Sequence, residues 1–306
     1  MSDSWLTFAP VEPSWHLPDG LGIPYKFSEG VSYRPIPEWV LLEDTVDLLR
    51  PRLREKIDDG ARYCIAVEYK ADALGSPDPQ WMGDQPRAIQ DTATERIRYV
   101  NLALWLVRPT ALSFNVIAHA ANHETEWVTR RIENYDSLCP LPEYAHETHT
   151  IEDIGKARLL FNALGALLFP GTLSTAVQST FRALTELGWT FRFLVLWLAL
   201  ESLFGPEDAR EITFRISQRI AFFLESDRAR ARELYSNVKE SYSWRSKVVH
   251  GLRLEKLTPE KSQKLLLELE GLVRRSLLTI LSEETMIATF DEKTREEYLD
   301  GLAFRQ

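Results

Sequence analysis

The chain has 306 residues and a formal net charge of −9, with 44% hydrophobic and 26% charged side chains. This balance is that of a globular protein and excludes collagen-like, purely coiled-coil and wholly disordered chains. The acidic total also excludes a protein coated with basic residues for nucleic-acid binding.

Charge and proline divide the sequence into two halves. Residues 1–150 hold 14 basic and 23 acidic side chains and 13 of the 16 prolines, whereas residues 151–306 hold 22 basic and 22 acidic side chains. Because proline ends helices and is excluded from central strands, long helices are expected only in the second half. We predict an α+β protein with a mixed α+β domain over residues 1–145, a helical bundle over residues 150–290, and an acidic C-terminal tail over residues 291–306.

The compartment follows from the cysteines and the apolar stretches. Two cysteines cannot form a disulfide framework, which favours a reducing, cytoplasmic environment. Residues 1–5 show no basic and apolar regions of a signal peptide. The longest uncharged stretch, residues 159–181, is interrupted by glycine, proline and polar residues, so we predict no membrane-spanning helix.

The first half is expected to contain short strands and helices. Residues up to 37 are rich in proline, tryptophan and tyrosine, and we expect them to lie as an extended segment over a surface. Alternating apolar residues with β-branched and aromatic side chains predict strands over residues 62–70 and 111–119. Helical periodicity predicts helices over residues 41–56 and 94–107.

The second half is divided into helices by glycine, proline and capping residues. Gly205-Pro206 and Gly251 mark helix ends, and Thr258-Pro259 marks a helix start. Ser226 or Asp227 is a candidate cap for the helix that follows. Short connections favour antiparallel neighbours in an all-helical bundle. The predicted helices span residues 151–168, 173–187, 190–204, 207–224, 228–250 and 258–281.

A charged side chain interrupts the core-facing pattern of the helix over residues 228–250. Arg245 falls within a stripe of apolar residues spaced by three and four. A guanidinium in such a place keeps its charge and needs a charged or multiply hydrogen-bonded partner. Glu201 follows eight apolar residues and is the one acidic group in residues 190–204. We therefore predict that Glu201 is the buried partner of Arg245.

A second stripe of the same helix carries polar groups. Tyr242, Ser246 and His250 are spaced by four, so they lie along one helical face beside Arg245. We expect the four side chains to converge on one groove, with Lys247 and Arg253 near its edge. His250 is at the helix C-terminus, where the helix dipole favours the imidazolium form that a general acid needs.

These residues lie in a pattern that resembles the HEPN superfamily. The segment Ser241-Tyr-Ser-Trp-Arg245-Ser-Lys-Val-Val-His250-Gly251 is similar to the Arg-x4–6-His motif of that superfamily. The segment Leu196-Trp-Leu-Ala-Leu-Glu201-Ser-Leu-Phe204 resembles its acidic helix, in particular in the Apea-like branch. Residues 215–224 fit the intervening helix. The resemblance covers about residues 150–285.

The resemblance implies a helical bundle that forms a homodimer and cleaves RNA without a metal or other cofactor. It assigns Arg245 to the scissile phosphate and His250 to the proton of the attacking 2′-hydroxyl or of the leaving 5′-oxygen. The products would be a 2′,3′-cyclic phosphate and a 5′-hydroxyl. Glu201, Tyr242, Ser246 and Lys247 would support the site, and Arg219 and Arg253 would bind RNA. Ser246 stands where the family often has Asn, Asp or His.

The sequence thus predicts a cytoplasmic endoribonuclease with a toxin or anti-phage defence role. Its acidic first half would be a sensor that binds a trigger ligand or protein. The alternative is a non-catalytic module, in which the helical half forms dimers and the first half binds a ligand or partner. Cleavage activity distinguishes the two.

Other chemical groups in the first half favour structural roles. The four histidines have spacings that a zinc site could use, but they match no zinc motif, so we predict no metal site and rank a metal-dependent hydrolase last. The five tryptophans could stack on bases, but the acidic surroundings favour core or interface roles. Cys64 lies in a predicted strand and is expected in the core. The histidines are His119, His123, His146 and His149, and the tryptophans are Trp15, Trp39, Trp81, Trp105 and Trp127.

Overall fold

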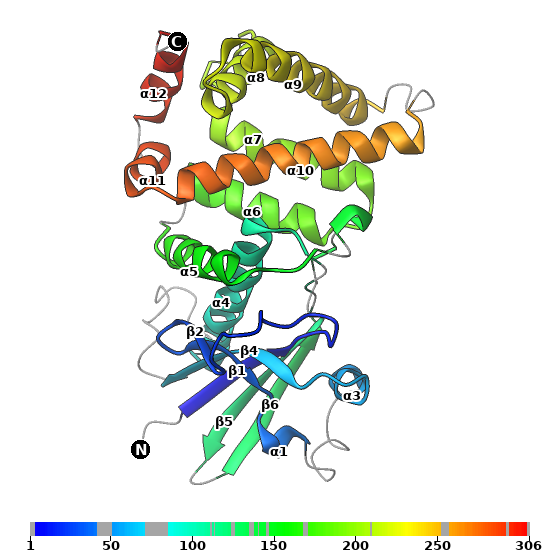
Figure 1. The fold of residues 1–306 in the computed structure, drawn as a ribbon, viewed down its shortest axis with the longest axis vertical. Helices are drawn as coiled ribbons and strands as arrows, with labels where there is room; N and C mark the ends of the chain where they lie inside the picture. Colours follow the sequence, from blue (N-terminus) through cyan, green and yellow to red (C-terminus); the bar gives the residue numbers. More distant parts are fainter. Residues whose placement is uncertain are drawn as a thin grey trace. The chain divides into compact units, whose positions relative to one another are not determined.

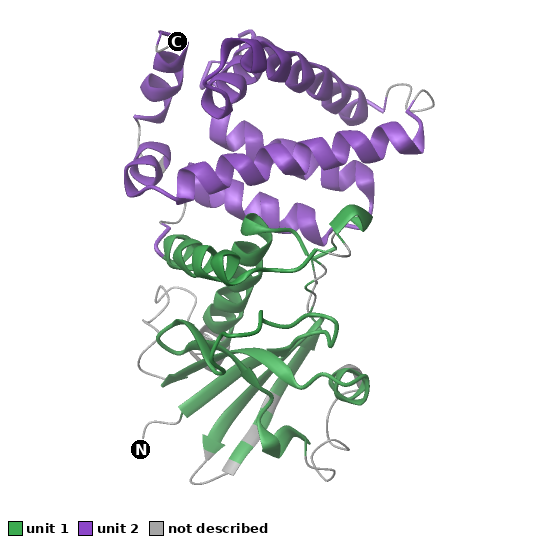
Figure 2. Cartoon of the chain, in the orientation of Figure 1, with its two compact units in different colours: residues 1–165 green, residues 166–306 purple. Residues whose placement is uncertain are grey.

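The protein folds into two compact units, residues 1–165 and residues 166–306 (Figure 2). In this computed structural model the first unit contains an antiparallel sheet and the second unit is helical (Figure 1), so the predicted α+β class is confirmed. The structure describes residues 4–41, 51–70, 85–110, 112, 114–123, 126–134, 138–139, 141–144, 147–167, 171–208, 210–251, 257–291 and 294–304.

The sheet of the first unit has six described strands in the order β2-β3-β4-β1-β5-β6. Neighbouring strands are antiparallel throughout. The predicted strand over residues 62–70 corresponds to β4, and the one predicted over residues 111–119 begins later, as β5. The strands are β1 (Ser4–Pro10), β2 (Tyr25–Ser28), β3 (Val31–Pro35), β4 (Tyr63–Lys70), β5 (Val116–His123) and β6 (Glu126–Asn134).

The beginning of the chain forms part of the sheet, and the expectation that it lies over a surface is wrong. β1 pairs with β4 on one side and with β5 on the other, so it is a central strand. Its residues Leu6 and Phe8 are buried on one face, and Thr7 and Ala9 are buried on the other. A strand that is covered on both faces reads as a continuous buried run and loses the alternation that predicts a strand.

Helices cover the sheet of the first unit. A cluster that includes Leu6, Phe8, Val40, Leu53 and Ile57 fills one face beneath α1 (Glu38–Leu41) and α3 (Pro51–Asp58). The predicted helix over residues 41–56 falls partly on residues 42–50, which lie outside the described residues. The long helix α4 (Gln85–Val107) contacts β1 and β4, and a short 3₁₀ turn, η2 (Pro142–Tyr144), follows later in the chain.

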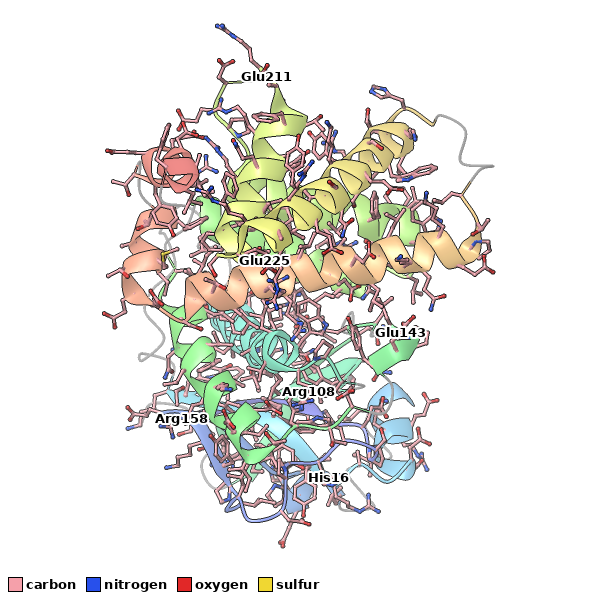
Figure 3. The ribbon with its side chains drawn as sticks, turned by 45° about the horizontal axis from the view of Figure 1, so that its top comes forward. His16, Arg108, Glu143, Arg158, Glu211 and Glu225 are labelled. Carbon is pink, nitrogen blue, oxygen red and sulfur yellow. The ribbon has the colours of Figure 1, made fainter. Side chains whose placement is uncertain are left out.

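The division between the units lies after residue 165 and differs from the predicted boundary at residues 145–150. The reason is that α5 (Ile151–Gly165) packs against α4 and therefore groups with the first unit. Arg108, which follows α4 (Figure 3), donates a hydrogen bond from Nε to Asp153 Oδ2 at 2.8 Å and from Nη1 to Glu147 Oε2 at 3.2 Å. Charged groups thus hold α5 to the end of α4.

The helices of the second unit begin and end close to the predicted signals. α7 ends at Phe204, before Gly205-Pro206, and Asp227 and Thr258 cap α9 and α10. The core is built from large apolar residues such as Phe193, Leu196, Trp197 and Leu277. The helices are α6 (Thr172–Thr185), α7 (Trp189–Phe204), α8 (Ile212–Leu224), α9 (Arg228–Val249), α10 (Pro259–Leu281), α11 (Glu284–Asp291) and α12 (Arg295–Gly301), followed by the 3₁₀ turn η4 (Leu302–Phe304).

The predicted acidic tail over residues 291–306 is folded where the structure describes it. α12 contacts α8 and α11, and Leu299 and Leu302 are buried. The acidic residues of α12 have a partner, because Glu296 and Asp300 form ion pairs with Arg219 of α8. The segment is therefore a structural element of the second unit.

Within the described part of the chain, no helix combines the length and the apolar character that a membrane crossing requires.

Candidate functional site

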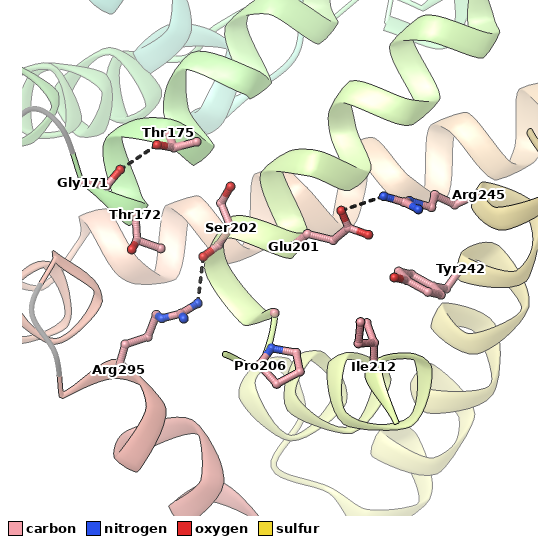
Figure 4. A pocket seen from close by; sticks show the side chains of 11 residues that line it. Gly171, Thr172, Thr175, Glu201, Ser202, Pro206, Ile212, Tyr242, Arg245 and Arg295 are labelled. Atoms are coloured by element: carbon pink, nitrogen blue, oxygen red, sulfur yellow. Dashed lines mark hydrogen bonds and ion pairs between the residues drawn. The ribbon is translucent and has the colours of Figure 1, made fainter. Parts of the chain in front are cut away.

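Glu201 and Arg245 meet between α7 and α9. Nη2 of Arg245 donates a hydrogen bond to Oε2 of Glu201 at 3.0 Å (Figure 4). The predicted pairing of these two residues is therefore present. The local chain favours it, because Gly205 accepts the close approach of the Glu201 carbonyl, where a Cβ atom would clash, and α7 can end one turn after Glu201.

The pair is less buried than the sequence predicts. The side chain of Arg245 is 31% exposed and that of Glu201 is 21% exposed. The neighbours Val238, Ser241 and Val248 on α9 are buried as expected. Arg245 departs from this buried stripe because it borders a cavity. A fully buried ion pair does exist in this unit, but it joins Arg192 of α7 to Glu270 of α10, with Nε–Oε1 at 2.6 Å.

The cavity has a volume of about 750 Å³. Its lining combines the Glu201–Arg245 pair with hydroxyl groups at the start of α6 and with a second arginine, Arg295 of α12 (Figure 4). Both guanidinium groups have a carboxylate partner, Glu201 for Arg245 and Glu296, at 3.4 Å, for Arg295. The cavity is lined by Gly171, Thr172, Thr175, Glu201, Ser202, Gly205, Pro206, Ile212, Tyr242, Arg245 and Arg295.

Tyr242 is fixed beside the ion pair. Its ring makes an edge contact with Trp197 at a centroid distance of 5.0 Å, and the guanidinium of Arg245 lies 5.7 Å from the ring centroid. The hydroxyl points toward Glu201 (Figure 4). Burial raises the pKa of Tyr242 to about 12, and the negative charge of Glu201 contributes to the increase. Tyr242 is therefore a neutral hydrogen-bonding group and not a base at neutral pH.

Arg295 was missed in the sequence because it lies in a segment predicted to be an acidic tail. Its Nη1 donates to the carbonyl oxygens of Ser202 at 2.9 Å and Leu203 at 3.1 Å, so it also closes the end of α7. Its side chain is 13% exposed, and burial lowers its pKa. The signal that could have found it is the spacing of Tyr298, Leu299 and Leu302, which is that of a short packed helix.

His250, Ser246 and Lys247 do not line this cavity. His250 follows α9 and is exposed, as is Ser246. Nζ of Lys247 lies 4.0 Å from the ring centroid of Trp244, and Lys261 of α10 lies over the same ring at 5.0 Å. The predicted convergence of Arg245, Tyr242, Ser246 and His250 on one groove is thus not seen within a single chain. Only Arg245 and Tyr242 are brought together.

The two residues predicted to bind RNA have different outcomes. Arg219 is 3% exposed, and its guanidinium binds Glu296, Asp300 and the Phe204 carbonyl oxygen. The prediction that Arg219 binds RNA is therefore corrected. Its charge is paired with carboxylates inside the protein and is not available to a phosphate. Arg253 lies outside the described residues.

Two histidines of the first unit, His119 and His149, are buried and form hydrogen bonds inside that unit. His119 hydrogen-bonds through Nδ1 to Thr7 at 2.9 Å and through Nε2 to Glu133 at 3.0 Å. His149 accepts from Trp15 Nε1 at 3.1 Å and contacts the Leu104 carbonyl oxygen at 3.1 Å. Among the described residues, no three histidine, cysteine or acidic side chains are grouped as a metal site would need. His146 and the side chain of His123 lie outside that description.

Two other expectations about the first unit concern single residues. Cys64 is fully buried in β4, and burial raises the pKa of its thiol to about 12, so it is an unreactive core residue. Trp15, Trp105 and Trp39 pack in the interior or against the core cluster, and Trp127 stacks on Trp39 at 6.5 Å. Trp81 lies outside the described residues.

Comparison with protein-family profiles, with curated proteins and with solved structures gives no match for this chain.

Proposed function

We propose that the protein is a metal-independent endoribonuclease of the HEPN type. The observation that carries the proposal is the Glu201–Arg245 ion pair at a cavity of about 750 Å³ that a second arginine, Arg295, also lines. The ion pair joins α7, which resembles the acidic helix of the HEPN superfamily, to α9, which carries the Arg-x4-His motif. The two helices follow each other along the chain as the resemblance requires. The Arg245 side chain is 31% exposed and borders the cavity, so a phosphate can reach it and replace part of its pairing with Glu201.

The chemistry needs no metal because the nucleophile belongs to the substrate. The 2′-hydroxyl oxygen attacks the adjacent phosphorus and loses its proton, and the bond from phosphorus to the 5′-oxygen breaks as that oxygen gains a proton. Arg245 stabilises the charge on the phosphorane, and His250 carries one of the two protons. The products are a 2′,3′-cyclic phosphate and a 5′-hydroxyl.

His250 is exposed at the end of α9 and outside the cavity of its own chain. The proposal therefore includes a homodimer, formed through the helical unit, in which two motifs share one cleft. A chain with an acidic first half, joined to such a unit, suits a cytoplasmic toxin or defence protein that stays silent until a ligand or protein binds that half.

The test is cleavage of total RNA in the presence of EDTA. We expect cleavage to persist with EDTA and to fall at least about 100-fold in Arg245→Ala and in His250→Ala, as for loss of a charge-stabilising or proton-transfer group. Arg230→Ala on the same helix and His16→Ala on the exposed surface of the first unit are matched controls. The product ends should carry cyclic phosphate. Cleavage that survives both site substitutions contradicts the proposal.

A second candidate is a non-catalytic module that dimerises or binds a partner. One observation favours it, which is an apolar stripe on and before α7: Leu187 is 87%, Phe191 67% and Leu198 48% exposed. Exposed apolar residues on one helical face are typical of an interaction surface. Light scattering that shows a dimer, together with RNA that stays intact in every condition, supports this candidate over the nuclease.

A further inference from the structure

A second cavity of the helical unit lies between α8 and α9. It has a volume of about 370 Å³ and shares no lining residue with the cavity of Arg245. α8 runs between Glu211 and Glu225, which Figure 3 labels, and a short connection leads from Glu225 to α9. The lining residues are Phe214, Gln218, Ala221, Phe222, Arg228, Ala231, Arg232, Tyr235 and Ala303.

Two small residues line the cavity where the two helices pack. Ala221 of α8 and Ala231 of α9 are both 1% exposed and leave room above them. The positions around them carry large rings instead. Phe214 and Tyr235 lie at 6.0 Å between ring centroids with an interplanar angle of 70°, and Phe214 is 46% exposed. The walls of the cavity therefore present aromatic surface that is partly exposed to solvent.

The rim of the cavity is basic. Arg228, Arg232, Tyr235 and Lys239 are spaced by four, three and four, so they share one face of α9. Nζ of Lys239 lies 5.7 Å from the Tyr235 ring centroid. The described residues that line the cavity include no carboxylate. Arg228 and Arg232 are exposed and lie one turn apart in the first two turns of α9.

We infer that this cavity binds a free nucleotide, a planar heteroaromatic base that carries a phosphate. The base would stack on the face of one of the two rings, Phe214 or Tyr235, and contact the edge of the other, because the rings are inclined at 70°; the amide of Gln218 could hydrogen-bond the edge of the base. Arg232, with Arg228 one turn before it, would bind the phosphate. The volume is at the lower end of the roughly 300–1,000 Å³ that is common for small-molecule sites, which fits one nucleotide. This inference does not rest on the proposed nuclease.

The experiment is calorimetric titration of the full chain with AMP, GMP, CMP and UMP. We expect at least one of them to bind, and both the matching nucleoside and inorganic phosphate to bind more weakly. Arg232→Gln and Tyr235→Leu should each weaken binding about tenfold or more, because each removes about 1.4 kcal/mol or more of charged or stacking interaction. Phe214→Leu provides the same test if Tyr235→Leu fails to fold.

The matched control is Arg230→Gln, an exposed arginine of the same helix that does not line the cavity, which should change binding less than twofold. Arg245→Ala should also retain binding, which separates this site from the nuclease site. The inference is overturned if no nucleotide binds, if binding is unchanged in Arg232→Gln and Tyr235→Leu, or if phosphate alone binds as tightly as the nucleotides. Binding of single-stranded oligonucleotides without mononucleotides also overturns it, since the cavity then belongs to an RNA surface.

Discussion

His119 has a structural role that depends on its neighbours in the sheet. It projects from β5 into a buried polar network that includes Thr7 of β1 and Glu133 of β6. Arg131 binds the same Glu133 oxygen at 2.8 Å, so the carboxylate is shared. A neutral imidazole satisfies this arrangement, since one nitrogen accepts from Thr7 and the other donates to Glu133. The residue holds three strands together and has no open coordination position.

The stability of the protein should therefore fall in mild acid. Burial, together with the charge of Arg131, lowers the pKa of His119 from 6.5 to about 4. Between these values the unfolded chain binds a proton that the folded chain does not, so stability decreases as the pH falls from about 6.5 to about 4. The loss from this residue is up to ~3 kcal/mol. Urea unfolding between pH 7 and pH 4.5 measures it.

The comparison that isolates His119 is between variants. His119→Gln should flatten the pH dependence, whereas His16→Gln, which changes an exposed histidine, should leave it unchanged. His149, whose pKa burial also lowers, contributes in the same direction and remains in both variants. Equal slopes in His119→Gln and the parent protein would show that His119 is not buried in its neutral form.

The partial burial of Glu201 sets how much its ion pair contributes to the free energy of unfolding. A buried ion pair that loses one partner typically costs 3–5 kcal/mol, but exposed pairs contribute about 0–1 kcal/mol. With exposures of 21% and 31%, we expect Glu201→Gln to reduce the free energy of unfolding by about 1–2 kcal/mol. The pKa of Tyr242 should decrease as well, because the carboxylate charge near it disappears.

Chemical denaturation measures the change in the free energy of unfolding. NMR of labelled tyrosine measures the pKa of Tyr242, whose signal is assigned by its loss in Tyr242→Phe. The matched control is Glu186→Gln, which breaks the ion pair between Arg182 of α6 and Glu186, the residue that caps the C-terminus of α6. This change should reduce the free energy of unfolding less than Glu201→Gln does. A loss of 3 kcal/mol or more would instead place the Glu201–Arg245 pair in the core, as the sequence predicts.

At the scale of elements, the sequence predicts those whose limits are set by local chemistry. Gly205-Pro206, Asp227 and Thr258-Pro259 end or begin helices through their own backbone and side chains, and the structure has these limits. β1 and β6 were missed because a strand is stabilised by partners far along the chain. α12 was not predicted because its acidic residues suggest a solvated tail. That Arg219 of α8 pairs with these residues is evident only from the structure.

The same distinction applies to the candidate site. Glu201 and Arg245 were predictable because each departs from the apolar pattern of its own helix. Their exposure, the absence of His250 from the cavity and the presence of Arg295 depend on how α7, α9 and α12 pack, which no pattern within one helix contains.

Arg219 should be the residue that fixes α12. It is 3% exposed and binds Glu296 and Asp300, whereas Arg215 reaches the same two carboxylates at 3.7 and 3.4 Å with 26% exposure. We expect Arg219→Gln to reduce the free energy of unfolding by about 2–3 kcal/mol, because it removes a guanidinium that is 3% exposed and binds two carboxylates and the Phe204 carbonyl oxygen, and Arg215→Gln to reduce it by less than about 1 kcal/mol.

Hydrogen exchange of residues 294–304 is the direct measurement. Exchange should accelerate in Arg219→Gln and stay close to the parent rate in Arg215→Gln, while α6 remains protected in both. Equal protection of α12 in the two variants would mean that Leu299 and Leu302 hold this helix without the ion pairs.

At the scale of the whole molecule, each unit has a core of its own. The core cluster of the first unit lies on its sheet, and the buried Arg192–Glu270 pair and the aromatic residues around Trp197 lie within the second. The acidic excess lies within residues 1–150, whereas the proposed catalytic groups lie in the second unit. The proposed sensor and the proposed nuclease would therefore each have a core of its own.

The proposed nuclease makes a prediction about pairs of molecules. Because His250 lies outside the cavity of Arg245 in one chain, each cleavage site should combine Arg245 of one protomer with His250 of its partner. A two-fold axis creates two such sites. Mixing inactive Arg245→Ala with inactive His250→Ala should then restore activity, since each mixed dimer has one site with both groups intact. With random exchange, the mixture should regain about a quarter of the parent activity, because half of the dimers are mixed and each has one of two sites.

The measurement is RNA cleavage after the two variants are co-refolded or co-expressed with different tags and the mixed dimers are purified. The purified mixed dimer should have about half of the parent activity. The double variant Arg245→Ala/His250→Ala, mixed with the parent protein, is the control: in its mixed dimer each site keeps one group and lacks the other, so that dimer should be inactive. Mixed dimers of the two single variants that form normally but do not cleave RNA would show that Arg245 and His250 must act from the same chain. Such a result would require α9 to rearrange, since the cavity holds only one of the two residues.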